Sequence, residues 1–132
     1  MSACILIAED HADSLALMQY LLTAHGYATI SAPDGECALH EARARLPDLI
    51  ICDLQMPKLS GFEVVSALRQ DARTEAIPVI AVTAFSMLGD REKVLSAGFN
   101  GYFSKPIEPD RFVAQVEPFL PKVLRAVRAS GG

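Results

Sequence analysis

The chain has 132 residues, of which 51% are hydrophobic and 21% charged, as expected for one domain with its own core. The net charge is −4, and residues 121–132 carry +3 with no acid, which leaves −7 on the rest. The strong negative charge of residues 1–120 argues against direct binding of nucleic acid. No apolar run approaches the roughly 20 residues of a membrane span, and no secretion signal is present, so we expect a cytoplasmic protein without a membrane partner.

Five short apolar runs, each of strand length, recur along the chain at residues 4–8, 28–32, 49–52, 79–82 and 102–103. Several of them are continuous rather than alternating, which is typical of strands that are covered on both faces. The three cysteines are an odd number at unrelated spacings, which predicts free thiols, with Cys4 and Cys52 buried as small hydrophobes.

Segments of helical length separate these runs. They carry apolar stripes, which are Leu15, Met18 and Leu22; Ala38, Leu39, Ala42 and Leu46; Val64, Val65 and Leu68; Val94 and Leu95; and Phe112, Val113 and Val116. The boundary signals are Asp13, Gly26, Asp34, Ser60 or Gly61, Asp90, Gly98 and Pro109. This β-α pattern, repeated five times, predicts an α/β protein with a parallel sheet and helices on both faces. Pro118 and Pro121 should end the last helix early.

Polar side chains follow four of the five expected strands. Glu9 and Asp10 follow the first strand, Asp53 the third, Thr83 the fourth and Lys105 the fifth. Ligands of open α/β sheets bind at the carboxyl ends of the strands, where the winding direction reverses. If the strand order is 2-1-3-4-5, all five residues gather at one edge.

Three carboxylates in one partly buried site repel each other strongly. Lys105 and a Mg²⁺ ion would relieve this repulsion and could hold the oxygens of a phosphoryl group while one carboxylate attacks phosphorus. Thr83 adds a hydroxyl donor, and Ala84 leaves room for the incoming group. Singly, each residue has a plainer role as a turn, cap, strand or surface residue, but five of them at four strand ends favour a site.

The chain resembles a two-component response-regulator receiver domain of the CheY-like superfamily. The matching pieces are ILIAED (5–10), LIICDLQMP (49–57), Gly61, VTA (82–84) and GYFSKPI (101–107). The resemblance covers residues 4 to about 120. It implies a flavodoxin-like (βα)5 fold with a doubly wound parallel sheet, strand order 2-1-3-4-5 and three α/β/α layers. Residues 1–120 would form the receiver domain and residues 121–132 a tail or the start of a linker.

The resemblance also assigns a phosphoacceptor and a metal site. Asp53 would accept a phosphoryl group from the phosphohistidine of a sensor histidine kinase or a histidine phosphotransfer protein. Asp10 and Asp53 would hold Mg²⁺ (or Mn²⁺) directly, the Gln55 backbone carbonyl would add an oxygen, and Glu9 would bind through water.

A switch is implied as well. Lys105, Thr83 and Ala84 would contact the phosphate, Lys105-Pro106 would be a cis peptide, and Thr83 and Tyr102 would respond to phosphorylation together. The face built from the fourth helix, fifth strand and fifth helix would then change its affinity for a downstream protein. The chain would be a monomer or a weak phosphorylation-dependent dimer. It would not be an enzyme, and would catalyse only its own phosphorylation and dephosphorylation.

Three other functions compete with this one. A Mg²⁺-dependent phosphatase with an aspartyl-phosphate intermediate would need an acid where Gln55 stands, because an amide is neither a general acid nor a base. A cofactor-binding flavodoxin-like protein would need a phosphate loop in place of AEDHADS (8–14). A degenerate receiver scaffold would have lost the acids or the lysine. Whether the chain stands alone or was cut from a hybrid histidine kinase stays open, with Met1 weakly favouring the former.

Two residues beside the site are expected to tune it. Gln55 and Phe85 lie two positions beyond Asp53 and Thr83, where they would line the route of water to the phosphate. The bulky Phe85 and the non-acidic Gln55 are predicted to slow the loss of phosphate. His11 is expected to be a neutral loop residue.

Overall fold

The computed structural model describes residues 3–84, 90–121 and 124. Five parallel strands form one sheet in the order β2-β1-β3-β4-β5; they are β1 (Cys4–Ala8), β2 (Ala28–Ala32), β3 (Leu49–Cys52), β4 (Val79–Thr83) and β5 (Gly101–Ser104). β1 lies between β2 and β3, so that Ile7 pairs with Ser31 on one side and Ile51 on the other. The predicted fold class and strand order are therefore confirmed.

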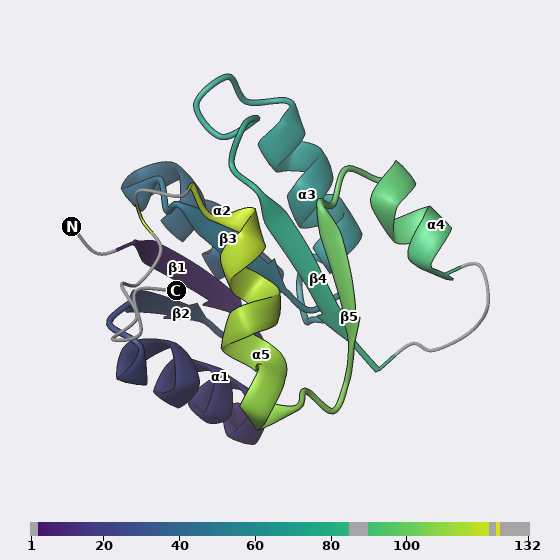
Figure 1. The fold of residues 1–132 in the computed structure, drawn as a ribbon. Helices are drawn as coiled ribbons and strands as arrows, with labels where there is room; N and C mark the ends of the chain where they lie inside the picture. The colour runs from purple at the N-terminus through teal and green to yellow at the C-terminus, as the bar shows by residue number, and fades with distance from the viewer. Residues whose placement is uncertain (1–2, 85–89, 122–123, 125–132) are drawn as a thin grey trace.

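Helices cover both faces of this sheet (Figure 1). They are α1 (Ala12–Ala24), α2 (Gly35–Arg45), α3 (Gly61–Arg69), α4 (Asp90–Ser96) and α5 (Pro109–Val116), followed by a short 3-10 helix, η1 (Glu117–Phe119). On one face Ile5 and Ile7 of the sheet pack with Met18 of α1 and Phe112 of α5. The other face packs against α2, α3 and α4 through residues that include Leu6, Ala38, Val64 and Val94.

Local capping signals explain where α2 and α3 begin. The Asp34 carboxylate caps α2 by accepting the Cys37 N–H over 2.7 Å. Ser60 and Glu63 form a reciprocal capping box at the start of α3. The expectation that Asp13 is a cap is wrong: α1 begins at Ala12 and Asp13 lies inside its first turn. An acid there still favours the positive end of the helix dipole.

Some apolar residues of the expected stripes lie outside the core. Leu46 is 49% exposed and Leu95 is 37% exposed. Leu46 follows the last turn of α2 in a left-handed conformation with φ of 46°, and on the short helix α4 the neighbouring Val94 takes the buried position. Cys52 is buried as expected, whereas Cys4 is only half-buried. In the described part of the chain no helix is long and apolar enough to cross a membrane.

Candidate functional site

Acidic residues from two neighbouring strands meet at the carboxyl edge of the sheet. Glu9 and Asp10 follow β1, and Asp53 follows β3, held in place by its N–H donating to Ala8 O over 2.9 Å. One ligand atom each of Glu9, Asp10, His11 and Asp53 lies within 4.8 Å of the others. Glu9 and Asp53 are only 1% and 5% exposed. The expected clustering of the acids is therefore present, and two of the three are removed from bulk water.

Lys105 reaches into this cluster from the end of β5. Its Nζ donates to Asp53 Oδ2 over 2.8 Å and also contacts Glu9 Oε1. The Lys105 N–H donates to Thr83 O over 2.8 Å, which holds the residue at the end of β5. The Lys105-Pro106 peptide is cis. Burial lowers the pKa of the Lys105 ammonium, but the hydrogen bonds and charges of Asp53 and Glu9 outweigh it and raise the pKa above its ordinary value. Lys105 therefore stays charged at neutral pH.

The Glu9 carboxyl has a raised pKa in this acidic cluster. Burial raises its pKa most, and nearby Asp53 raises it further; the hydrogen bonds from Lys105 and from the His11 N–H lower it, but the net pKa stays raised. Another cation beside these acids would relieve the repulsion. Carboxylate oxygens in such a group are the ligands that Mg²⁺ prefers, so the donor set fits this ion. When bound, Mg²⁺ would neutralise charge on phosphoryl oxygens.

The residues predicted around the acids have different places. Thr83 ends β4 and is buried, whereas the neighbouring Ala84 is exposed. Gln55 lies two residues beyond Asp53, and its backbone N–H donates to Asp53 Oδ1 over 3.1 Å. Tyr102 is half-buried on β5, opposite Ala81 of β4 in the strand register, and packs against the core beneath α2, α3 and α4. Phe85 lies outside the described residues.

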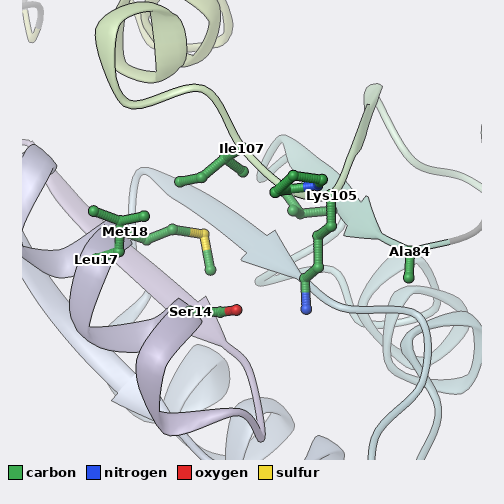
Figure 2. A pocket seen from close by; sticks show the side chains of 8 residues that line it. Ser14, Leu17, Met18, Ala84, Lys105 and Ile107 are labelled. Atoms are coloured by element: carbon green, nitrogen blue, oxygen red, sulfur yellow. The ribbon is translucent and has the colours of Figure 1, made fainter.

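Two adjoining cavities open at this edge of the sheet. The first, of about 270 Å³, is lined by His11, Ser14, Asp53, Gln55, Ala84 and Lys105. The second, of about 310 Å³, shares Ser14, Ala84 and Lys105 with it, and its other walls are apolar. Figure 2 shows Leu17 and Met18 of α1 on one side of the second cavity and Ile107 near Lys105 on the other. A reactant above Asp53 therefore meets an apolar recess beside the acids.

His11 lies against the acids of the site. Its Nδ1 lies 3.2 Å from Glu9 Oε2 and 3.3 Å from Asp10 Oδ1, and its N–H donates to Glu9 Oε2 over 3.1 Å. His11 is a loop residue, as expected, and its adjacency to the acid pair in the sequence was the signal for these contacts. Ser14 was missed by the sequence analysis, because only the helical turn after Asp10 brings it over the cavity.

The model of the response regulator receiver domain family matches residues 5–117, most of the chain. The chain belongs to this family. It is 42% identical over 120 residues to the polar-differentiation response regulator DivK of Brucella ovis, which covers 91% of this chain and 98% of that protein.

Solved receiver structures agree with the match. Chemotaxis response regulator CheY4 of Vibrio cholerae superposes with a TM-score of 0.86 at 27% identity, over 91% of this chain and 100% of that one. The receiver domain of sensor histidine kinase PA1611 of Pseudomonas aeruginosa, solved with a magnesium ion coordinated in its active-site cleft, has a TM-score of 0.82 at 28% identity, over 90% and 98%.

Family membership fixes the broad function. The chain is a receiver domain of a two-component phosphorelay, similar to DivK and with an acidic site of the magnesium-binding type. Receiver domains bind Mg²⁺ in the active site, and a receiver implies a histidine kinase as partner. A response regulator receiver is not a conventional enzyme, which sets the phosphatase alternative aside.

Proposed function

We propose that Asp53 of this receiver accepts a phosphoryl group from a phosphohistidine. The observation that carries the proposal is the placement of the Asp53 carboxylate, which lines a cavity while Lys105 Nζ holds one oxygen and the Gln55 N–H the other. In the transfer, an Asp53 oxygen forms a bond to phosphorus and the bond from phosphorus to the donor nitrogen breaks. The electron pair of that bond stays on the donor imidazole, so no oxidant or further reactant is needed.

We infer that this chain uses Mg²⁺ (or Mn²⁺) in that transfer. Asp10 and Asp53 would hold the ion directly, the Gln55 carbonyl would supply a further oxygen, and Glu9 would bind through water. The proximity of these acids and the raised pKa of Glu9 support the assignment, because both mark a site with excess negative charge.

We propose that Lys105, Thr83 and Ala84 surround the transferred group, and that Thr83 and Tyr102 carry the signal. Phosphorylation would stabilise the conformer in which Thr83 and Lys105 contact the phosphate, which shifts the population between two states. The responding surface would be the face of α4, β5 and α5. A cavity of about 270 Å³ on this side, lined by Tyr102, Phe103 and Gln115 among others, supports the proposal of a protein effector there.

The phosphodonor would be a sensor histidine kinase or a histidine phosphotransfer protein, acting on this chain as a monomer or weak phosphorylation-dependent dimer. We infer a cytoplasmic setting, which the three free cysteines support because thiols stay reduced there. We also infer that residues 121–132 are a tail or the start of a linker, in keeping with a family match that ends at residue 117.

The test is phosphorylation in vitro. The chain is incubated with Mg²⁺ and acetyl phosphate and its intact mass is measured, alongside Asp53→Asn and a sample without metal. One added phosphoryl group in the parent, absent from both controls, is the expected result. Addition of the group to Asp53→Asn would refute Asp53 as the acceptor. If the parent gains no group, binding of beryllofluoride with Mg²⁺ distinguishes a short-lived phosphate from a receiver that acts only as a scaffold.

A further inference from the structure

The loop between β3 and α3 carries Asp53 and Gln55, and its far end is strained. Lys58 has φ of 72°, and Leu59 N donates to Pro57 O over 2.8 Å, so that Lys58 is the centre of a tight three-residue turn. Turns of this kind are rare and strained for a residue other than glycine. Such a conformation persists only where the surrounding structure enforces it.

The start of α2 encloses this turn. Gly35 N donates to Pro57 O over 3.3 Å, and the Asp34 carboxylate lies 3.7 Å from Lys58 Nζ. Gly35 is buried against the loop backbone, and a Cβ added there would lie 2.0 Å from Leu59 O and 2.7 Å from Leu59 C. Only a residue without a side chain leaves space for the turn in this place.

The two ends of the loop are held together. Gly61 N donates to Leu54 O over 2.9 Å, and a Cβ on Gly61 would lie 2.4 Å from Asp53 O. The reciprocal cap of α3 at Ser60 fixes the entry to that helix. Because Leu54 on one side and Ser60 and Gly61 on the other are held, a displacement of Leu59 would pass into the segment from Gln55 to Lys58.

We propose that Gly35 is a positioning residue for the metal and phosphoryl site. It touches neither group, but the space it leaves sets where the β3–α3 loop lies, and so where Gln55 presents its N–H to Asp53 and its carbonyl to a cation. A side chain at residue 35 pushes Leu59 O back by about 1 Å to reach the 3.0 Å below which real contacts are essentially never seen. Mg²⁺ demands near-ideal octahedral geometry, so it tolerates such a shift poorly. This inference rests on the proposed function.

The test measures Mg²⁺ affinity without any phosphodonor, by calorimetric titration and by the Mg²⁺-dependent rise in melting temperature. We expect Gly35→Ala to bind Mg²⁺ at least about tenfold more weakly than the parent, as when a group that orients metal ligands is lost. The matched control is Gly26→Ala. Gly26 has φ of +90° and nothing within 4 Å of an added Cβ, so this change strains the backbone without crowding a neighbour. It should lower the melting temperature and leave Mg²⁺ affinity unchanged.

Equal Mg²⁺ affinities of the parent and Gly35→Ala would overturn this inference alone. A parent that binds no Mg²⁺, or binds it as tightly as Asp53→Asn, would overturn the proposed metal site and the inference with it. If Gly35→Ala does not fold, the double variant Gly35→Ala/Lys58→Gly replaces it, because glycine at residue 58 lets the loop yield without strain. That variant must then bind Mg²⁺ more weakly than Lys58→Gly does, and equal affinities would again overturn the inference.

Discussion

Lys105 Nζ donates to Asp53 Oδ2 over 2.8 Å, although the two residues lie 52 positions apart in the sequence. The same ammonium contacts Glu9 from another strand. One cation thus bridges two buried acids from different strands.

Lys105→Met should destabilise the folded chain. Without the ammonium, Glu9 and Asp53 lose a charged hydrogen-bond partner, and the free energy of unfolding at pH 7 without metal should fall by about 1–3 kcal/mol. The pKa of the Glu9 carboxyl is raised in the folded state, so the folded state binds a proton at Glu9 more tightly than the unfolded state does. As pH falls through this raised pKa towards 4.5, Glu9 becomes neutral and its repulsion with Asp53 disappears. Urea denaturation should therefore show a smaller loss at pH 5 than at pH 7.

The control for this change is Arg111→Met, which removes a cation from an exposed pair with Glu108 at 3.6 Å. Exposed pairs contribute little, so its effect should stay within about 0.5 kcal/mol. If Lys105→Met is no more destabilising than Arg111→Met, the bridge has no net stabilising effect.

Thr83→Val should separate phosphorylation from signalling. Valine keeps the volume of this buried strand end but removes the hydroxyl proposed to meet the phosphate. Intact mass should show phosphorylation close to the parent, whereas the change in the Tyr102 ring resonances on phosphorylation should shrink, together with binding to a phosphorylation-dependent partner. Thr74→Val, which removes another buried hydroxyl whose bond goes to Leu68 O, should leave that response intact. A full Tyr102 response in Thr83→Val would refute the switch.

Phe85→Ala should speed the loss of phosphate from Asp53. The prediction rests on sequence position, since a bulky side chain two residues after Thr83 is expected to obstruct attacking water. The phosphorylated fraction, followed by mass after removal of the donor, should decay roughly three- to tenfold faster, a change in barrier of about 1 kcal/mol. An unaltered decay rate would remove the steric half of the tuning hypothesis and leave Gln55 as the remaining contributor.

Tyr27→Phe should destabilise the end of the domain remote from the proposed phosphorylation site. The Tyr27 hydroxyl donates to Glu117 Oε2 over 2.5 Å, and both residues are buried. Loss of this donor should lower the free energy of unfolding by about 1–3 kcal/mol, because the acceptor is an acidic side chain held away from water. Tyr20→Phe removes the hydroxyl of a tyrosine that is 69% exposed and should have almost no effect. Equal urea midpoints for the two variants would contradict the prediction.

The Asp71 carboxyl should titrate far below an ordinary aspartate. Hydrogen bonds from the Arg73 side chain and backbone lower its pKa to about 2, and Arg43 contributes less. Its small stabilising effect is present above the unfolded pKa of 3.8 and is lost as pH falls through 2. An NMR titration should show a clear rise of this pKa in Arg73→Ala and a smaller one in Arg43→Ala. The reverse order would show that the charge of Arg43 dominates.

The local elements of this fold could be predicted from the sequence with few errors. The first three expected strands have the observed bounds, and β4 and β5 differ only at their ends. Apolar runs and helix caps depend on residues close together in the chain, so they can be recognised in a single sequence. The errors occur where the tertiary environment overrides the local pattern. Asp13 is of a residue type that often caps helices, but it lies inside α1. Leu95 fits the helical spacing of buried residues, but Val94 takes the buried position.

By itself, the sequence determined which residues end each strand, and so which acids, hydroxyl and lysine were available for a site. Only the tertiary structure decided that Lys105 bridges Glu9 and Asp53, and that Gly35 leaves room for the turn at Lys58. These contacts join elements remote in the chain, and their geometry depends on strand order and on how α2 packs against the β3–α3 loop. Hydrophobic periodicity encodes which face of an element is buried, but not which element lies next to it.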